Sequence, residues 1–179
     1  MQTNKIPCLL AILTCLITSA CKCPRSKDAS LSKSDTTIYA YPIKYPGRWV
    51  IDTGHVNTAV ALKALKAFEK NDTAEMKAYF ADTLIAGFDG SSFKGPRCQF
   101  LAMVKNERDG LKKVTNQLYD CQAVTSKDKT EGWITTWLLQ VTTDMRDKTD
   151  SIEYVYDSQF KNGKIIMWNK YARHLKKID

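Results

Sequence analysis

The chain has 179 residues, of which 44% are hydrophobic and 26% are charged, the proportions of an ordinary soluble globular protein with one domain. Lysine and arginine number 27 against 19 aspartate and glutamate, so the formal net charge is +8. The basic residues are spread along the whole chain, with no tight block and no nucleic-acid motif, which excludes a recognisable nucleic-acid-binding protein and favours a solvated basic surface.

Residues 1–20 have the pattern of a signal peptide. Lys5 supplies a positive charge, and the apolar run at 8–17 is too short to span a bilayer and is followed by small residues. Residues 18–21 (Thr-Ser-Ala-Cys) resemble a bacterial lipobox, in which Cys21 becomes the lipidated first residue; they also suit ordinary signal-peptide cleavage. We therefore expect a cell-envelope protein, held by lipid at the outer membrane or the periplasmic face. The alternative is a secreted or periplasmic soluble protein.

The segment 21–44 is rich in Ser, Lys, Asp and Thr and has too few apolar side chains to fold alone. It is typical of a flexible tether, lipidated or free, that leads to a folded domain at 45–179. The tether would hold this domain clear of the membrane.

The cysteines indicate no metal or cofactor chemistry. No pair has CxxC or zinc-ligand spacing, and His55 and His174 are too few and too distant to complete a metal site. Cys98 and Cys121 form a disulfide or remain two free thiols, and the sequence leaves both open. We expect no metal and no cofactor.

Three helices are predicted in the first half of the domain. Helical spacing runs from 52 to 70, and a capping-box-like start at 72–75 begins a short second helix. A brief strand at 84–88 and a turn follow, and Gly95 and Pro96 open a third helix that Gly110 closes. The apolar residues expected to face inward from these helices are Ala61, Leu62, Leu65, Phe68, Met76, Tyr79, Phe80, Phe100, Leu101 and Val104.

The second half of the domain is predicted to be strand. The β-rich runs are 114–124, 133–145, 152–160 and 164–173. Asn162-Gly163 predicts a two-residue type I′ hairpin, because both central positions need a positive φ. Counting outward from that turn pairs Phe160 with Ile165, Tyr156 with Asn169, and Tyr154 with Tyr171, all on the face expected to cover the helices. The same count places Trp168, Lys170 and Asp157 on the outer face.

Helices followed by a long antiparallel sheet are the plan of an α+β cone. The segments 61–72, 79–82, 133–137 and 161–165 resemble SnoaL-like domains of the nuclear transport factor 2 superfamily. More narrowly, the chain is similar to lipoproteins of Bacteroidetes-type bacteria that carry this domain, over about residues 49–176. The resemblance implies three N-terminal helices packed in a strongly curved, mainly antiparallel sheet, with a pocket between them. It also implies a possible homodimer through the outer face of the sheet.

Some members of that superfamily are isomerases, cyclases or dehydratases, which need a proton-moving carboxylate or His and a donor for an enolate. The resemblance aligns the isomerase positions with Ala64, Ala86 and Tyr156, so one donor remains and the base is missing. Asp157 is expected on the outer face, Asp144 in a turn or edge role, and His55 in an exposed or capping role at a helix start. None of them replaces the missing base.

The sequence therefore favours a non-catalytic module that binds a small apolar or aromatic molecule, or a protein partner. The alternative is an isomerase-, dehydratase- or hydrolase-type enzyme with an unrecognised acid/base pair in the pocket. An apolar pocket with a few placed polar groups is typical of small-molecule sites. The candidate pocket residues are Tyr156, Tyr154, Asn169, Tyr171, Trp137 and Phe88.

Overall fold

A computed structural model describes residues 40–173 of the chain. The predictions for the signal peptide, for lipidated Cys21, for most of the tether and for His174 lie outside these residues. The chain divides into two compact units between Ile43 and Lys44, and the architecture below belongs to the second unit.

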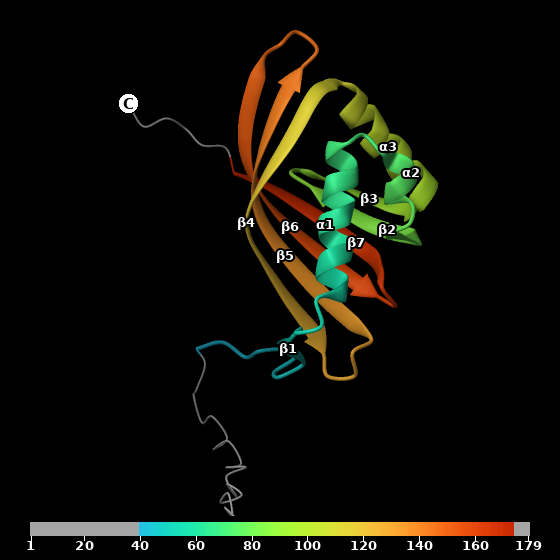
Figure 1. The fold of residues 1–179 in the computed structure, drawn as a ribbon. Coiled ribbons are helices and arrows are strands. Elements are labelled where there is room, and N and C mark those ends of the chain that lie inside the picture. The colour runs from blue at the N-terminus through green and yellow to red at the C-terminus, as the bar shows by residue number, and fades with distance from the viewer. Residues whose placement is uncertain (1–39, 174–179) are drawn as a thin grey trace, which may run out of the picture. The chain divides into compact units, whose positions relative to one another are not determined.

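Seven strands form one sheet in the order β1-β4-β5-β6-β7-β2-β3 (Figure 1). Neighbouring strands are antiparallel except for β2 and β7, which are parallel. The long central strands are strongly curved (Figure 1). The strands are β1 (Trp49–Ile51), β2 (Phe80–Phe88), β3 (Ser91–Pro96), β4 (Leu111–Ser126), β5 (Glu131–Asp144), β6 (Thr149–Lys161) and β7 (Lys164–Arg173).

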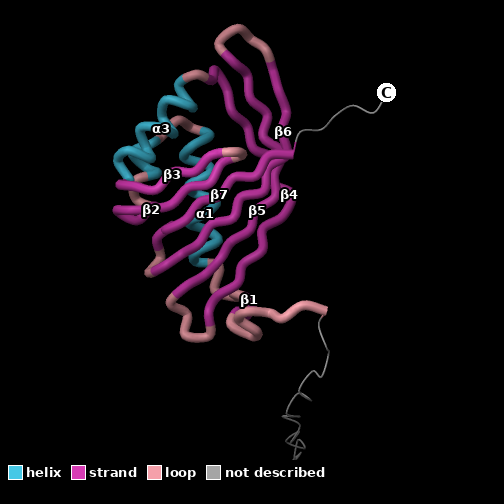
Figure 2. The backbone as a smooth tube through the Cα atoms, turned by 180° about the vertical axis from the view of Figure 1, so that it is seen from behind, coloured by secondary structure: helices cyan, strands magenta, loops and turns pink. Residues whose placement is uncertain are grey.

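The helices α1 (Val56–Glu69), α2 (Thr73–Met76) and α3 (Arg97–Asp109) lie on one face of the sheet. Seen from behind, the strands β4 to β7 are in front, and no described helix covers them (Figure 2). Within residues 40–173 no helix is both long and apolar enough to cross a membrane. This arrangement confirms the predicted α+β cone.

Helix α1 forms because its apolar residues recur at helical spacing and bury one face. Ala61, Leu65 and Phe68 are all at most 6% exposed, as predicted. The helix begins at Val56 rather than near Asp52, because the Asp52 carboxylate accepts a hydrogen bond from the Gly54 N–H at 2.9 Å and closes a turn there.

The start of α2 follows half of the predicted capping box. The Asp72 carboxylate accepts from the Glu75 N–H at 2.7 Å, as predicted. The Glu75 carboxylate does not reach back to the cap but accepts from the Tyr79 hydroxyl at 2.6 Å. Phe80 is buried as expected, although it begins β2 rather than ending the helix.

Two edge strands were not predicted, and β2 is longer than predicted. Strand β1 has three residues and pairs only with β4. Strand β3 contains Gly95 and Pro96, which indicated a helix start; an edge strand tolerates both because its outer N–H groups need no partner. Pro96 does precede the first residue of α3, as predicted.

The β6–β7 hairpin confirms the predicted turn, since Asn162 and Gly163 have φ of 52° and 71°. Phe160 pairs with Ile165, also as predicted, but a β-bulge follows at Ile166. Beyond it Tyr156 pairs with Lys170, not with Asn169, so the predicted register is wrong by one residue along most of β7.

The bulge changes which side chains of β7 face the helices, because one extra residue reverses the alternation of the strand. Trp168 is 7% exposed and packs in the core, against the prediction that it faces outward. Lys170 shares its side of the sheet. The site is therefore built from a face of β7 that the sequence placed outside.

Candidate functional site

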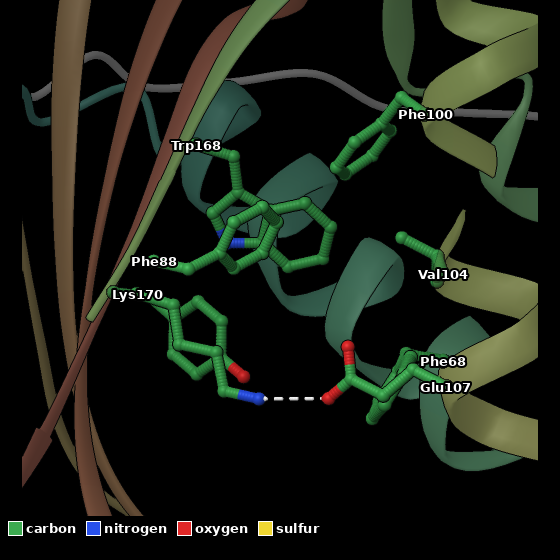
Figure 3. A pocket seen from close by; sticks show the side chains of 8 residues that line it. Phe68, Phe88, Phe100, Val104, Glu107, Trp168 and Lys170 are labelled. Carbon is green, nitrogen blue, oxygen red and sulfur yellow. Dashed lines mark hydrogen bonds and ion pairs between the residues drawn. The ribbon is translucent and has the colours of Figure 1, made fainter. Parts of the chain in front are cut away.

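A pocket lies between the helices and the sheet, and Figure 3 shows its lining side chains. Its cavity volume is about 20 Å³, which is space for roughly one water molecule. Aromatic rings fill the remainder of the interior. The lining residues are Phe68 from α1; Phe100, Val104 and Glu107 from α3; and Phe88, Tyr156, Trp168 and Lys170 from the sheet.

The interior is narrow because Trp168 stands in its centre. The Trp168 ring lies 4.9 Å from the Phe80 ring, 5.9 Å from Phe100 and 5.5 Å from Tyr156, centroid to centroid. These distances are those of favourable tilted aromatic pairs. The interior of the cone is therefore a packed core and not a chamber.

A larger space opens beside this core, at the mouth of the cone. It is a cleft of about 320 Å³, and it shares Phe88, Glu107 and Lys170 with the interior pocket. Its size reaches the lower end of the range of small-molecule sites. The mouth is lined by Phe88, Asp89, Glu107, Tyr154, Lys170 and Ala172.

An ion pair stands at the boundary between interior and mouth (Figure 3). The Lys170 ammonium donates to the Glu107 carboxylate at 3.1 Å and lies 4.4 Å from the centre of the Tyr154 ring. The Lys170 side chain is 15% exposed and that of Glu107 is 47% exposed. Lys170 is thus held in place, while its carboxylate partner is about half exposed to solvent.

Burial and neighbouring charges determine the protonation states of Lys170 and Tyr156 at neutral pH. Burial lowers the pKa of Lys170, but its interactions with Tyr156, Glu107 and Tyr154 outweigh burial and raise that pKa above its ordinary value. Burial raises the pKa of Tyr156 to about 12. The site therefore presents an ammonium and a neutral phenol, both hydrogen-bond donors, beside one carboxylate.

The structure brings together three of the six predicted pocket residues. Tyr156 and Phe88 line the interior, and Tyr154 lies at the mouth. Their role in binding stays a prediction, but their position agrees with it.

The other three predicted residues do not face the pocket. Asn169 lies between Trp168 and Lys170 on β7, so it points to the opposite side, as does Tyr171, which is 51% exposed. Trp137 alternates with Thr136 and Leu138, which are both buried, and so faces away from the helices. The bulge explains Asn169 and Tyr171; Trp137 follows from the alternation of β5.

Sequence reasoning missed Lys170 and Glu107. The Ile166 bulge hid Lys170. Glu107 carried a usable signal, because it follows Phe100 and Val104 at the i, i+4, i+7 spacing of one helix face, which placed it beside the apolar residues of α3.

The three residues aligned with isomerase chemistry are part of the core, and of these Tyr156 alone carries a polar side-chain group. Ala64 and Ala86 are completely buried. Asp157 accepts from the Thr135 hydroxyl across β5 and β6, and Asp144 accepts from the backbone of Lys148 and Arg146 in a turn. Neither carboxylate lines the interior pocket or the mouth.

The cysteines of the described residues are not joined to each other. Cys98 is exposed, and the Cys121 thiol lies 3.5 Å from the Thr136 hydroxyl. Over residues 40–173 no group of three or more His, Cys, Asp or Glu side chains is placed to hold a metal ion.

No protein-family model matches the chain, and no curated protein matches it in sequence. Solved structures do match the fold. A putative polyketide cyclase from Xanthomonas campestris has 17% identity and a TM-score of 0.51 over 66% of this chain and 91% of its own. A putative dehydratase of the NTF2-like family from Streptomyces avermitilis has 10% identity and a TM-score of 0.57 (66% and 94%). An LEH-like epoxide hydrolase from M. tuberculosis has 13% identity and a TM-score of 0.54 (66% and 83%). At these identities the likeness shows the NTF2-like cone fold.

Proposed function

We propose that this chain, whose described domain has the NTF2-like cone fold, is a non-catalytic envelope protein that binds a small, flat, partly apolar molecule with an anionic group. The observation that carries the proposal is the fixed Lys170 ammonium beside aromatic walls at an open cleft of about 320 Å³. We also propose that the chain is exported and lipidated at Cys21. Metabolic labelling with a fatty acid tests lipidation: the wild type should carry the label, and the Cys21→Ala variant should not.

The ligand lies at the mouth and not in the interior, because the interior cavity of about 20 Å³ admits no organic molecule. Phe88 and Tyr154 offer apolar surface to its ring. Its anionic group replaces Glu107 as the partner of Lys170, which is feasible because Glu107 is half exposed and its carboxylate is stable in water.

The protonation states support binding rather than catalysis. A general base works best when its pKa lies near the working pH. Tyr156 and Lys170 have raised pKa values and keep their protons at neutral pH. The Glu107 carboxylate already accepts a hydrogen bond from the Lys170 ammonium.

An acid–base enzyme is the second candidate, and one observation favours it. Glu107, Tyr156 and Lys170 line one pocket, so a carboxylate and two proton donors stand around the same space. The three structural neighbours named above are a cyclase, a dehydratase and an epoxide hydrolase by their descriptions. Turnover of a substrate that is abolished in the Glu107→Gln variant would establish this alternative.

Naphthoate, a flat aromatic carboxylate, tests the binding proposal by calorimetric titration of the full chain. We expect saturable binding that is about tenfold weaker in Lys170→Met, because a charge-assisted hydrogen bond is lost. Lys105→Met is the matched control: Lys105 also pairs with a carboxylate on α3, that of Asp109, but lies outside the mouth. Its affinity should equal that of the wild type.

Naphthamide, the uncharged analogue, separates recognition of charge from recognition of the ring. It should bind the wild type and Lys170→Met equally weakly. The proposal is wrong if naphthoate does not bind, or if Lys105→Met weakens its binding as much as Lys170→Met.

A further inference from the structure

A second cleft, of about 300 Å³, lies at the start of β7, at the other end of this strand from the mouth. Its floor is apolar and its rim is basic. It is lined by Phe80, Ala81, Ile166, Asn162, Asp82, Arg97, Lys161 and Lys164. Three of these side chains are cationic and one is a carboxylate.

The cleft exists because β2 and β7 separate over a short stretch. Phe80 pairs with Ile165, and the next pair is Ile85 with Met167, so β2 advances five residues while β7 advances two. The ladder between the two strands is interrupted there, and the Ile166 bulge lies in the same stretch. The opening therefore coincides with an irregularity in the backbone pairing of the two strands.

Arg97 is fixed at the rim of this cleft. Its Nη1 donates to the Phe80 carbonyl at 2.8 Å, and its Nη2 lies 2.8 Å from the Asp82 carboxylate. The Arg97 side chain is 22% exposed, whereas that of Asp82 is 92% exposed. Because an ion pair with so exposed a partner contributes little free energy, another anion can displace Asp82.

Two lysines complete the positive rim. Lys164 is oriented by donating to the Ala78 carbonyl, and Lys161 lies at the end of β6, beside the hairpin turn. Within the lining, Asp82 is the one group that offsets these three charges.

We propose that this cleft binds a phosphate group, with the guanidinium of Arg97 as its main ligand and Lys161 and Lys164 as supporting charges. The planar fork of an arginine matches two phosphate oxygens, and the already fixed side chain loses little entropy on binding. Ala81 and Ile166, which are partly exposed, offer apolar surface to the carbon part of a phosphate ester. The ester is a soluble phosphate compound or a phospholipid headgroup, which share this chemistry.

Inorganic phosphate, titrated at constant ionic strength into the isotopically labelled full chain, tests the site. The NMR signal of the Arg97 side-chain N–H should shift saturably. Lys161→Gln should weaken phosphate binding severalfold and leaves the Arg97 contacts intact. Asp82→Asn should tighten binding severalfold, because it removes the competing carboxylate, and Arg97→Gln should weaken it at least tenfold.

The chain offers a matched pair of controls in the turn after β5. Arg146 and Asp144 also form an Arg–Asp ion pair there, at 3.2 Å, but line none of this cleft. Arg146→Gln and Asp144→Asn should leave phosphate affinity unchanged. The proposal fails if no saturable shift occurs, if Asp82→Asn weakens binding, or if the control variants change it as much as the cleft variants.

Vesicles distinguish the two sources of the phosphate. Binding to phosphatidylglycerol vesicles but not to phosphatidylcholine vesicles, lost in Lys161→Gln and kept in Arg146→Gln, assigns the cleft to a lipid headgroup. Phosphate binding without such vesicle binding assigns it to a soluble ester. Equal vesicle binding by both variants, without phosphate binding, overturns the site.

Discussion

The interior and the mouth of the cone are adjacent but are built differently. In the interior, Trp168, Phe80 and Phe100 fill the concave side of the sheet and leave about 20 Å³. At the mouth, Lys170 and Glu107 border an open space of about 320 Å³. In this chain the depth of the cone is therefore packed core, and its rim is an open cleft.

This difference limits what the fold alone says about function. Structural neighbours at 10–17% identity share the cone, and their names describe several kinds of enzyme. In this chain the positions that the resemblance aligned with an isomerase's helix tyrosine and base hold Ala64 and Ala86, both buried. Function resides in particular side chains and not in the architecture.

The largest expected effect comes from emptying the interior. Trp168→Ala should lower the free energy of unfolding by about 3–5 kcal/mol, because it removes a buried aromatic ring and leaves a cavity. Urea denaturation measures the loss. Indole should bind in the new cavity and restore part of the lost free energy of unfolding. The interior of the variant would then bind a small molecule, which the filled interior of the wild type cannot do.

Trp137→Ala is the matched control for this change, because Trp137 is on the outward side of β5 and is partly exposed. It should cost less stability, and indole should not restore it. Equal losses in the two variants would contradict the distinction between a filled interior and an uncovered sheet face.

Much of the fold could be predicted because its signals are local. The apolar spacing of α1, the Asn162-Gly163 turn and the bounds of β7 all follow from neighbouring residues. The bulge at Ile166 did not, because regular alternation is the default and the parallel contact of β7 with β2 is distant in sequence. One unpredicted residue was enough to reverse the faces assigned to Trp168 and Lys170.

The positions of the site residues were predictable only where they did not depend on the β6–β7 register beyond the Ile166 bulge. Tyr156 alternates from Phe160 along β6 without interruption, and its inward position was predicted. The ion pair joins α3 to β7, so neither partner alone signals it. Such a contact becomes visible only when the two elements are packed together.

A second prediction uses the buried phenol at the boundary of the two regions. Burial raises the pKa of Tyr156 to about 12 in the folded protein, from an ordinary value of 10.0. The unfolded chain thus loses this proton first, so the stabilisation is complete below pH 10.0 and is lost as the pH rises toward about 12. The linked loss is about 2–3 kcal/mol.

Tyr156→Phe tests this linkage, because phenylalanine has no proton to lose. Urea denaturation at neutral pH and near pH 12 gives the unfolding free energies of wild type and variant. Relative to the variant, the wild type should lose about 2–3 kcal/mol between these two pH values. Tyr171→Phe, at an exposed position, is the control and should show no such shift. A constant difference for Tyr156→Phe would mean that water reaches the phenol.

The smallest expected effect on stability concerns the ion pair at the mouth. Glu107→Gln leaves the Lys170 ammonium largely buried without its carboxylate and should cost about 1 kcal/mol, a modest loss because Glu107 is half exposed. Lys170→Met keeps a chain of similar length against Tyr154 and leaves a half-exposed Glu107 that water can solvate, so it should cost less stability than Glu107→Gln. Urea denaturation of both variants measures the order.

The combination of stability and binding then separates the two roles of Lys170. If the lysine serves recognition, Lys170→Met unfolds at nearly the same urea concentration as the wild type yet binds naphthoate about tenfold more weakly. If it serves the fold, the stability loss of Lys170→Met exceeds that of Glu107→Gln. Only the first result agrees with the proposed role of the mouth. A lysine that contributes little to the free energy of folding can exchange its carboxylate partner for the anionic group of a ligand without destabilising the core.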